Sequence, residues 1–361
     1  MRLILTFFSA TAPAVIKEDS TEVLNRIRGN QLRPILLLWT PVWNTYLKQE
    51  DLADMNCFGS SIPCDVTSDR GVAHEAAAII FHARDVSFLD MPKKKYVGQP
   101  WILWNQESPS RSPRHVYEQG GTLFDLEMSY RRTADIFAPY GYITKNDPEI
   151  VGENKEELKR RFRMQKGAAW LASDCWTESR REDYVGELRK FFPVDVYGSC
   201  GNNVCSKHSA DSCMGDISKK YMFYLAFENS LCPDYITEKL YRTLQYPIIP
   251  VVLSGARYSS LENHQSLFVD ASNIEPRLLA LKLQAISQNL TYYEKYFAWK
   301  KKYSARGQWS PICQVCNFAR KQLKNSSVQT TKKPTYLTDR MNHKACKMWN
   351  SMHQQFEFVS L

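Results

Sequence analysis

Short, continuously apolar runs alternate with polar segments along most of this chain, a pattern typical of buried parallel strands separated by helices and loops. In the first half, such runs lie at 34–40, 76–81 and 101–104, and residues 125–132 alternate between apolar and polar positions. In the second half, strands are expected at 167–173, 194–198, 221–227 and 248–253, with a helix near 181–192. Residues 145–166 are charged, which predicts an exposed linker or a solvated helix. The pattern therefore predicts two α/β halves.

One strand-helix-strand unit of the second half concentrates polar side chains. Its first strand ends at Phe227, polar residues follow from Glu228, and Asp234 is the expected N-cap of the next helix. Ile236, Leu240 and Leu244 then recur at the spacing of one apolar helix face. Such a unit places its ligand beyond the carboxyl end of the strand, where the N–H groups of the first helical turn favour an anion.

Two further side chains support this interpretation of the unit. Tyr235 and Lys239 lie one helical turn apart at the expected helix start, where they would add a hydroxyl and a cation on the same face. The segment therefore predicts a site for a phosphorylated ligand.

Three blocks of this region resemble the signature of a known enzyme family. FYLAFENS at 223–230, DYITEKL at 234–240 and PVVL at 250–253 occur in order and at the expected spacing. They are similar to blocks of the α1,3-fucosyltransferases of glycosyltransferase family 10, which transfer L-fucose from GDP-fucose to a hydroxyl of N-acetylglucosamine. The resemblance implies a GT-B fold, in which two doubly wound, Rossmann-like α/β domains face each other across a cleft.

The expected domain organisation follows from the pattern and the resemblance together. It comprises a leader or truncated anchor and stem over 1–30, an acceptor-side domain over 31–150, a linker over 151–166, a GDP-fucose-binding domain over 167–323 and a polar tail over 324–361. The family has a membrane anchor, but the partly apolar segment at 3–16 is shorter than the roughly 20 residues that a membrane span requires. A truncated anchor and a signal peptide both remain open as interpretations.

A carboxylate follows the expected strand at 101–104. A sugar hydroxyl is a poor nucleophile, so its transfer chemistry needs a group within hydrogen-bond reach that can take its proton. Glu107, in the sequence WNQESP at 104–109, is the candidate base. The family has an Asn-x-Glu-Ser-Pro-like motif after a Trp-rich strand, and the resemblance implies the catalytic role of its Glu for Glu107. The alternative is a glutamate that caps, or is merely exposed in, a turn.

The resemblance also implies an arginine that binds the diphosphate. Arg181, expected at a helix start, looks like that residue, although Arg180 is adjacent and Asp174 stands where the family usually has Asn. A guanidinium suits phosphate because it donates two parallel hydrogen bonds. An exposed arginine at the helix start is the alternative.

The signature blocks supply the other donor-binding candidates. The resemblance implies that Lys239 neutralises the leaving phosphate and that Asn229 and Tyr235 donate hydrogen bonds to the diphosphate. Glu238 would contact sugar or ribose hydroxyls, or stabilise the positive charge that develops on fucose.

Motif absences and charge limit the classes of ligand. The sequence has no Asp-x-Asp tripeptide and no His-Glu-x-x-His motif, which predicts a metal-independent transferase without a cofactor, whose lysine and arginine replace a divalent cation. The 47 Lys and Arg exceed the 38 Asp and Glu and give a formal charge of +9. The cationic runs are short and scattered, and no nucleic-acid-binding motif surrounds them, so no nucleic-acid partner is expected.

Ten cysteines favour disulfides. The one C-x-x-C pair, Cys313 and Cys316, lacks the further ligands that a zinc site needs. The family ties such a late pair to N-terminal cysteines, which implies bridges from Cys313 and Cys316 to Cys57 and Cys64 in either order. Local bridges are open among Cys200, Cys205 and Cys213, whereas no partner is predicted for Cys175, Cys232 and Cys346.

Two N-x-S/T sequons, at Asn289 and Asn325, agree with a secretory compartment. Together with the resemblance they imply a Golgi membrane enzyme with a lumenal catalytic domain, or a secreted enzyme if the leader is cleaved.

The segment FHARD at 81–85 looks like the family's His-His-Arg-Asp block. It places His82 and Arg84 at the end of a first-domain strand, where the acceptor should approach. In the family an arginine at this position accompanies α1,3 transfer and an aromatic residue accompanies α1,4 transfer, so Arg84 predicts an α1,3 linkage. The alternative is that Arg84 pairs with Asp85 or a surface carboxylate.

The predicted function is an inverting α1,3-fucosyltransferase with GDP-fucose as donor. The implied acceptors are the N-glycan core N-acetylglucosamine and the disaccharides LacNAc and LacdiNAc. Two alternatives stay open: a GT-B transferase that uses another sugar nucleotide, and a catalytically silent glycan-binding protein on the same fold.

Overall fold

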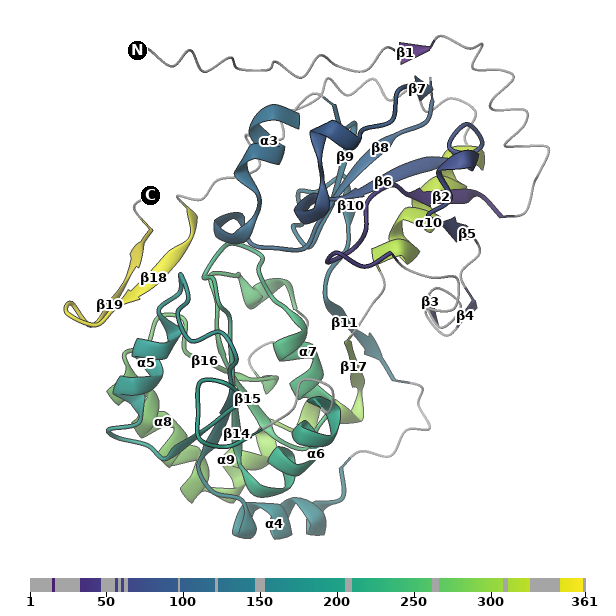
Figure 1. Ribbon diagram of the computed structural model, residues 1–361. Coiled ribbons are helices and arrows are strands. Elements are labelled where there is room, and N and C mark those ends of the chain that lie inside the picture. The colour runs from purple at the N-terminus through teal and green to yellow at the C-terminus, as the bar shows by residue number, and fades with distance from the viewer. Residues whose placement is uncertain are drawn as a thin grey trace, which may run out of the picture. The chain divides into compact units, whose positions relative to one another are not determined.

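The computed structural model describes residues 15–16, 33–46, 56–57, 60–61, 64–96, 98–120, 123–146, 153–204, 210–261, 266–307, 311–324 and 345–359. They form two compact units, each around its own parallel sheet (Figure 1). Unit 1 comprises Met1–Glu107, Arg111–Ala138 and Ser310–Asn342, and unit 2 comprises Ser108–Ser110, Pro139–Trp309 and His343–Leu361. The expected leader lies almost wholly outside the described residues. No helix in the described ranges is both long enough and apolar enough to cross a membrane.

The sheet of unit 1 has six strands in the order β10-β9-β8-β6-β2-β5, and every pair is parallel. Counted along the chain this order is 2-1-3-4-5-6, so the connections change direction between β2 and β6. This reversal is the topological switch point of the sheet. The strands are β2 (Ile35–Leu38), β5 (Asp65–Thr67), β6 (Ala78–His82), β8 (Trp101–Asn105), β9 (Leu126–Ser129) and β10 (Ile136–Phe137). The remaining elements are α3 (Arg114–Gly120), α10 (Pro311–Lys324), and the two-residue strands β1 (Val15–Ile16), β3 (Asn56–Cys57), β4 (Ser60–Ser61) and β7 (Lys95–Tyr96).

The sheet of unit 2 has five parallel strands in the order β13-β12-β14-β15-β16, or 2-1-3-4-5 along the chain. Its switch point lies between β12 and β14. The strands are β12 (Ala168–Leu171), β13 (Val194–Tyr197), β14 (Phe223–Phe227), β15 (Ile249–Leu253) and β16 (Val269–Asp270). The helices are α4 (Lys155–Met164), α5 (Arg181–Leu188), α6 (Ala210–Lys220), α7 (Glu238–Leu244), α8 (Pro276–Gln288) and α9 (Leu290–Lys295). Two antiparallel pairs complete the unit: β11 (Gly141–Lys145) with β17 (Tyr303–Gly307), and β18 (Lys347–Asn350) with β19 (Gln355–Phe358).

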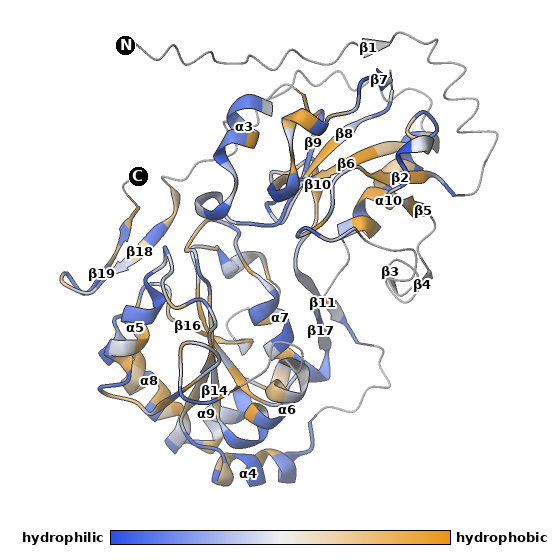
Figure 2. Cartoon of the chain, viewed as in Figure 1, coloured by the Kyte–Doolittle hydropathy of each residue, from blue (hydrophilic) through white to orange (hydrophobic). Residues whose placement is uncertain are grey.

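Alternate side chains of β14 enter two different hydrophobic cores. Phe223, Leu225 and Phe227 pack with residues of α5 and α8, whereas Tyr224 and Ala226 pack with residues of α6 and α7. Figure 1 shows these helix pairs on opposite sides of the sheet. Because both faces are covered, the central strands β12, β14 and β15 are apolar throughout, which is why continuous apolar runs identified them. Figure 2 shows the same hydrophobic colour along β2 and β6 of unit 1.

The prediction of α/β architecture with parallel sheets is therefore confirmed, whereas the segment after residue 324 and helix α10 differ from expectation. The charged segment at 145–166, expected as an exposed linker or a solvated helix, contains α4, a largely solvated helix that also buries Leu158 and Arg161. The segment after residue 324, expected as a polar tail, contains the β18–β19 hairpin, and its Trp349 is buried in the core of unit 2 against Tyr184. Helix α10, expected in the second domain, belongs to unit 1.

The disulfides confirm part of the expected pattern and extend it. Cys64 bonds to Cys316, as the resemblance implied. Cys313 is also disulfide-bonded, but the side chain of its expected partner, Cys57, lies outside the described part of the chain. Two further bridges were not predicted: Cys232 with Cys346, and Cys175 with Cys200, which replaces the suggested pairing of Cys200 with Cys205 or Cys213.

Removing the Cys64–Cys316 bridge is expected to lower the free energy of unfolding by roughly 2–5 kcal/mol. The bridge closes a loop of 252 residues and so restricts the unfolded chain. The measurement is denaturant unfolding of the Cys64→Ser/Cys316→Ser variant. Removing the Cys175–Cys200 bridge, whose separation is 25 residues, is the matched control and should cost about 2 kcal/mol less on the chain-entropy account. Peptide mapping that found Cys64 as a free thiol in the wild type would contradict the assignment.

Candidate functional site

The switch point of unit 2 brings two of the predicted segments together. The loop after β12 leads to Arg181 at the first position of α5, and the loop after β14 carries Glu228 and Asn229. The backbone N–H of Ser179 donates to the carbonyl of Asn229 at 3.0 Å, so the two loops are directly bonded. In open α/β sheets this is the position where ligands bind.

Arg181 is the buried arginine of the adjacent pair. Its side chain is 4% exposed, whereas Arg180 is exposed and holds the left-handed N-cap position with φ 55°. The guanidinium donates to the carbonyls of Phe227, at 2.7 Å, and Asp174, at 3.2 Å. Its Nε–H is buried and has no hydrogen-bond partner among the described residues. Burial lowers the pKa of Arg181 from its ordinary value, although three nearby carboxylates oppose the shift. A ligand oxygen that accepted from Nε would satisfy the buried donor.

Helix α7 begins three residues later than the sequence suggested. Its N-cap is Thr237, because Asp234 has a left-handed backbone with φ 61° and lies outside the helix. Glu228 fixes this start: its carboxylate accepts from the Thr237 N–H at 2.8 Å and from the Thr237 hydroxyl at 2.8 and 2.9 Å. The predicted apolar stripe of Ile236, Leu240 and Leu244 is buried as expected.

Lys239 lies in a cluster of charges at the start of α7. Its Nζ is 3.0 Å from the Glu228 carboxylate and 3.3 Å from that of Glu238, and it donates to the Thr237 hydroxyl at 2.7 Å. Burial alone would lower the pKa of Lys239, but the two carboxylates outweigh burial and hold it above its ordinary value. Burial raises the pKa of Glu228, which is 2% exposed. Lys239 itself is partly exposed, at 24% of its side chain, so it can reach a ligand while paired.

The other predicted donor-binding residues lie in the same loop or helix. The side-chain oxygen of Asn229 is buried and has no partner within the described ranges. Tyr235 is 3% exposed and packs edge-on against Tyr140, with ring centroids 6.3 Å apart. Glu238 is more accessible, at 36% of its side chain. The structure thus places Asn229, Tyr235, Glu238 and Lys239 in one segment that leaves β14 and enters α7.

Unit 1 holds the backbone of Glu107 in place two residues beyond β8. Asn105, 4% exposed, accepts from the Glu107 N–H through its side-chain oxygen at 3.0 Å and donates to the Ser112 hydroxyl at 2.7 Å. Ser112 donates in turn to the Glu107 carbonyl at 3.3 Å. Tyr117 of α3 accepts a further bond from Asn105 at 2.5 Å. Both backbone polar groups of Glu107 are therefore fixed by one buried network.

His82 and Arg84 lie at the switch point of unit 1. The buried His82 ring is hydrogen-bonded through Nδ1 to Asp85, yet burial outweighs that contact and lowers the pKa of His82. The expected alternative, an ion pair between Arg84 and Asp85, is absent from the described residues. The Arg84 guanidinium instead lies 4.6 Å from the ring centroid of Trp43.

Of the two sequons, only Asn289 is described. It is exposed, and its side-chain oxygen accepts from the Tyr292 N–H at 3.0 Å as the N-cap of α9, so the sequon lies at an accessible helix start. Asn325 lies outside the described residues. Within the ranges that the structure covers, no group of three or more His, Cys, Asp or Glu side chains could hold a metal ion.

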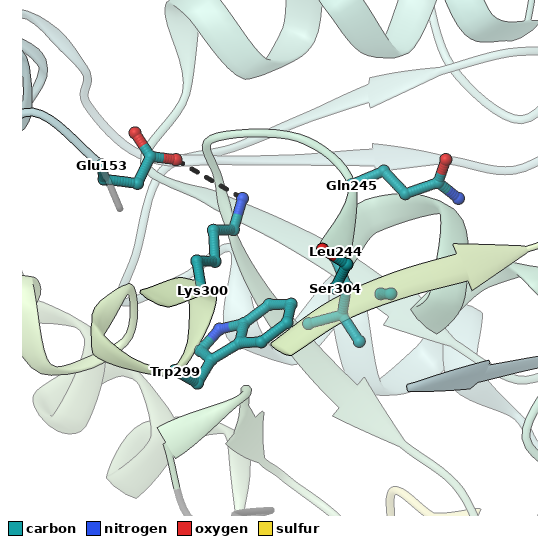
Figure 3. A pocket seen from close by; sticks show the side chains of 7 residues that line it. Glu153, Leu244, Gln245, Trp299, Lys300 and Ser304 are labelled. Carbon is teal, nitrogen blue, oxygen red and sulfur yellow. Dashed lines mark ion pairs between the residues drawn. The ribbon is translucent and has the colours of Figure 1, made fainter. Parts of the chain in front are cut away.

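A cavity of about 420 Å³ in unit 2 is lined by none of the predicted site residues. Figure 3 shows Lys300 and Glu153 pointing toward each other there, with Trp299 beside Lys300. The Lys300 Nζ lies 3.6 Å from the Glu153 carboxylate. Burial lowers the pKa of Lys300 to about 8. This cavity borders Leu244 at the end of α7 that is opposite Lys239.

The sequence did not reveal three structural roles at the site. Thr237 is the N-cap of α7, Glu228 anchors that helix start, and Ser179 bonds to Asn229. A threonine directly before the apolar face of a helix is an N-cap signal, and it was available at Thr237. The bond from Ser179 to Asn229 had no comparable signal, because it joins backbone groups 50 positions apart.

The chain matches two protein-family models. Residues 162–334 match the family described as "Glycosyltransferase family 10 (fucosyltransferase) C-term", and residues 31–141 match "Fucosyltransferase, N-terminal".

Similar proteins agree with these matches. Alpha-(1,3)-fucosyltransferase C of Drosophila melanogaster is 30% identical over 329 residues, covering 81% of this chain and 76% of that protein. Human 4-galactosyl-N-acetylglucosaminide 3-alpha-L-fucosyltransferase FUT6 is 33% identical over 298 residues, covering 78% of each. A crystal structure of an alpha1,3-fucosyltransferase with GDP-fucose shares the fold, with a TM-score of 0.52 and 14% identity over 89% of this chain and 96% of that one.

Proposed function

This chain belongs to the glycosyltransferase family 10 fucosyltransferases, and we propose that it transfers L-fucose from GDP-fucose to a hydroxyl of N-acetylglucosamine in an α1,3 linkage. The observation that carries the proposal is the switch point of unit 2. There, Arg181, Asn229 and Lys239 supply a buried guanidinium, an amide and a partly exposed ammonium at adjoining loop ends. The names of the Drosophila and human relatives support the same donor sugar and linkage.

In the proposed mechanism the reaction is a single displacement. Glu107 takes the proton of the acceptor hydroxyl as the oxygen forms a bond to C1 of fucose and the bond from C1 to the GDP oxygen breaks. The β-linked donor thus gives an α-linked product. Arg181, Lys239, Tyr235 and Asn229 bind the departing diphosphate, so its charge is stabilised without a metal ion or cofactor. The fixed backbone of Glu107 supports its role, because a base must be held in position to be effective.

We extend the proposal to architecture and location. The two units would be the two domains of a GT-B transferase, a proposal supported by the switch-point order of both sheets. The Golgi lumen or the secreted state is proposed because the described part of the chain contains three disulfides with both partners resolved, and such bonds persist in oxidising compartments. The accessible sequon at Asn289 fits the same compartment.

Profiling of donors and acceptors tests the function. Purified protein is incubated with a panel of sugar nucleotides and with N-glycan core, LacNAc and LacdiNAc acceptors. Among the sugar nucleotides of the panel, we expect only GDP-fucose to give a product. Product with another sugar nucleotide would favour a different transferase, and glycan binding without any product would favour the silent glycan-binding protein.

Arg84 is proposed to set the linkage. With type 1 and type 2 chains mixed as acceptors, the wild type should give predominantly α1,3-fucose, and Arg84→Trp should shift the ratio toward α1,4-fucose. The reason is that a guanidinium donates hydrogen bonds to an acceptor hydroxyl, whereas an indole offers mainly a stacking face. Linkage analysis of the products is the measurement. An unchanged ratio would remove Arg84 from linkage control.

A further inference from the structure

A tight turn follows β2 at the switch point of unit 1. Val42 and Thr45 exchange both of their backbone hydrogen bonds, at 2.8 and 3.1 Å. The two central residues have left-handed backbones, with φ 54° at Trp43 and 61° at Asn44. Asparagine tolerates this conformation, but for a bulky residue such as tryptophan it is a strained outlier. Strain of this kind persists only where the surroundings hold it, and it often marks a ligand site.

Asp85 holds the strained turn. One oxygen of its carboxylate accepts from the Trp43 N–H and the other from the Asn44 N–H, both at 2.9 Å. The same carboxylate is hydrogen-bonded to His82 at the end of β6. The turn is therefore fixed through its backbone to the neighbouring strand of the switch point.

Trp43 is 50% exposed, although the backbone that carries its indole is held firmly. The His82 ring lies 5.5 Å from the indole, tilted by 53°, and the Arg84 guanidinium lies 4.6 Å from its centroid. A large, half-exposed aromatic surface on a fixed backbone, next to a guanidinium that can donate hydrogen bonds, combines the apolar and polar elements of a small-molecule site.

We propose that the Trp43 indole is the platform on which a pyranose ring of the acceptor stacks, with Arg84 donating hydrogen bonds to hydroxyls at the edge of that ring. This inference rests on the proposed function, because it takes the acceptor to be a glycan. A pyranose presents a face of C–H groups that packs on an aromatic ring, while its hydroxyls project outward toward donors. The switch point is the position in a parallel sheet where such a ligand binds.

The test compares Trp43→Ala with wild-type enzyme, with LacNAc as the acceptor and GDP-fucose as the donor. The KM for LacNAc should rise by roughly 10- to 100-fold, the loss typical of truncating an aromatic anchor. The KM for GDP-fucose and the kcat at saturating LacNAc should change by less than about threefold, because only ground-state binding is removed. Trp43→Phe, which keeps an aromatic face, should recover much of the affinity. The melting temperature should stay near wild type because Asp85 binds the backbone of the turn.

Tyr46→Ala is the matched control, since Tyr46 is an aromatic residue of the same segment and is equally exposed, at 51%. It should leave the KM for LacNAc unchanged. An unchanged KM in Trp43→Ala would overturn the platform, and so would an equal rise in Tyr46→Ala. If Arg84→Ala reproduced the whole rise and the double variant added nothing, the indole would only position Arg84, which also overturns the proposal. Failure of the proposed function is distinct, because the wild type itself would then transfer no fucose to LacNAc.

Discussion

Replacing Glu107 with glutamine is expected to lower kcat by roughly 10²- to 10⁴-fold, the usual contribution of a positioned general base. Glutamine has the same shape, and the bonds from Asn105 and Ser112 reach only the backbone of Glu107, so the loop should keep its conformation. The affinity for GDP should therefore stay near the wild-type value. Steady-state kinetics and calorimetric titration with GDP measure the two quantities.

Glu118→Gln provides the control for this variant, because Glu118 is an exposed carboxylate on the nearby helix α3. It should have wild-type turnover. An equal loss of GDP binding and turnover in Glu107→Gln would indicate a structural glutamate, and turnover within threefold of the wild type would exclude Glu107 as the base.

The second large effect is expected at Lys239. Lys239→Ala should weaken GDP binding by roughly 10- to 100-fold, because hydrogen bonds to charged groups contribute about 1.5–3 kcal/mol. It should also destabilise the protein by about 3–5 kcal/mol, since the buried carboxylate of Glu228 loses its nearest cation. Arg181→Ala should weaken GDP binding by a similar factor. Calorimetry and denaturant unfolding separate the binding effect from the stability effect.

A double variant distinguishes direct binding by Lys239 from a structural role. Lys239→Ala/Glu228→Gln removes both charges of the pair, so most of the lost stability should return. If Lys239 contacts the diphosphate, GDP affinity should stay low in this double variant. A recovery of both quantities would assign Lys239 to the support of Glu228 alone. If the GDP affinity were unchanged in both Lys239→Ala and Arg181→Ala, the switch point of unit 2 would not be the diphosphate site.

Much of the fold could be predicted from the sequence because the central strands of both sheets are buried on two faces. Such strands are short apolar runs, and each of the six runs at 34–40, 76–81, 101–104, 167–173, 221–227 and 248–253 overlaps a strand of the structure. The ribbon of β11 and β17 gave no such signal. Its strands are half exposed and lie about 160 residues apart, so neither composition nor local periodicity indicates their pairing.

In the candidate site, too, features that depend on neighbouring residues could be predicted from the sequence, whereas those that depend on contacts between distant residues could not. The position of Arg181 at a helix start was predicted, since it depends on the local alternation of strand and helix. The helix start at Thr237 was not predicted, because Asp234 is an equally good N-cap residue by type. Only the contact of Thr237 with Glu228 decides between the two residues. The bridge of Cys232 with Cys346 joins residues 114 positions apart, and spacing alone cannot select it among ten cysteines.

The β18–β19 hairpin also affects the order in which a newly made chain matures. Its backbone donates to Leu231 and to Ser179, and Cys346 beside it bonds to Cys232, so it supports both loops of the switch point. Protein synthesis adds roughly 5–20 residues per second, and the 114 residues between these cysteines therefore take roughly 6–23 s. During that interval both strands β12 and β14 exist while Cys232 is still a free thiol, open to exchange with cysteines made earlier. Newly synthesised molecules should therefore form the sheet of unit 2 first and become able to bind nucleotide only after this last bridge closes.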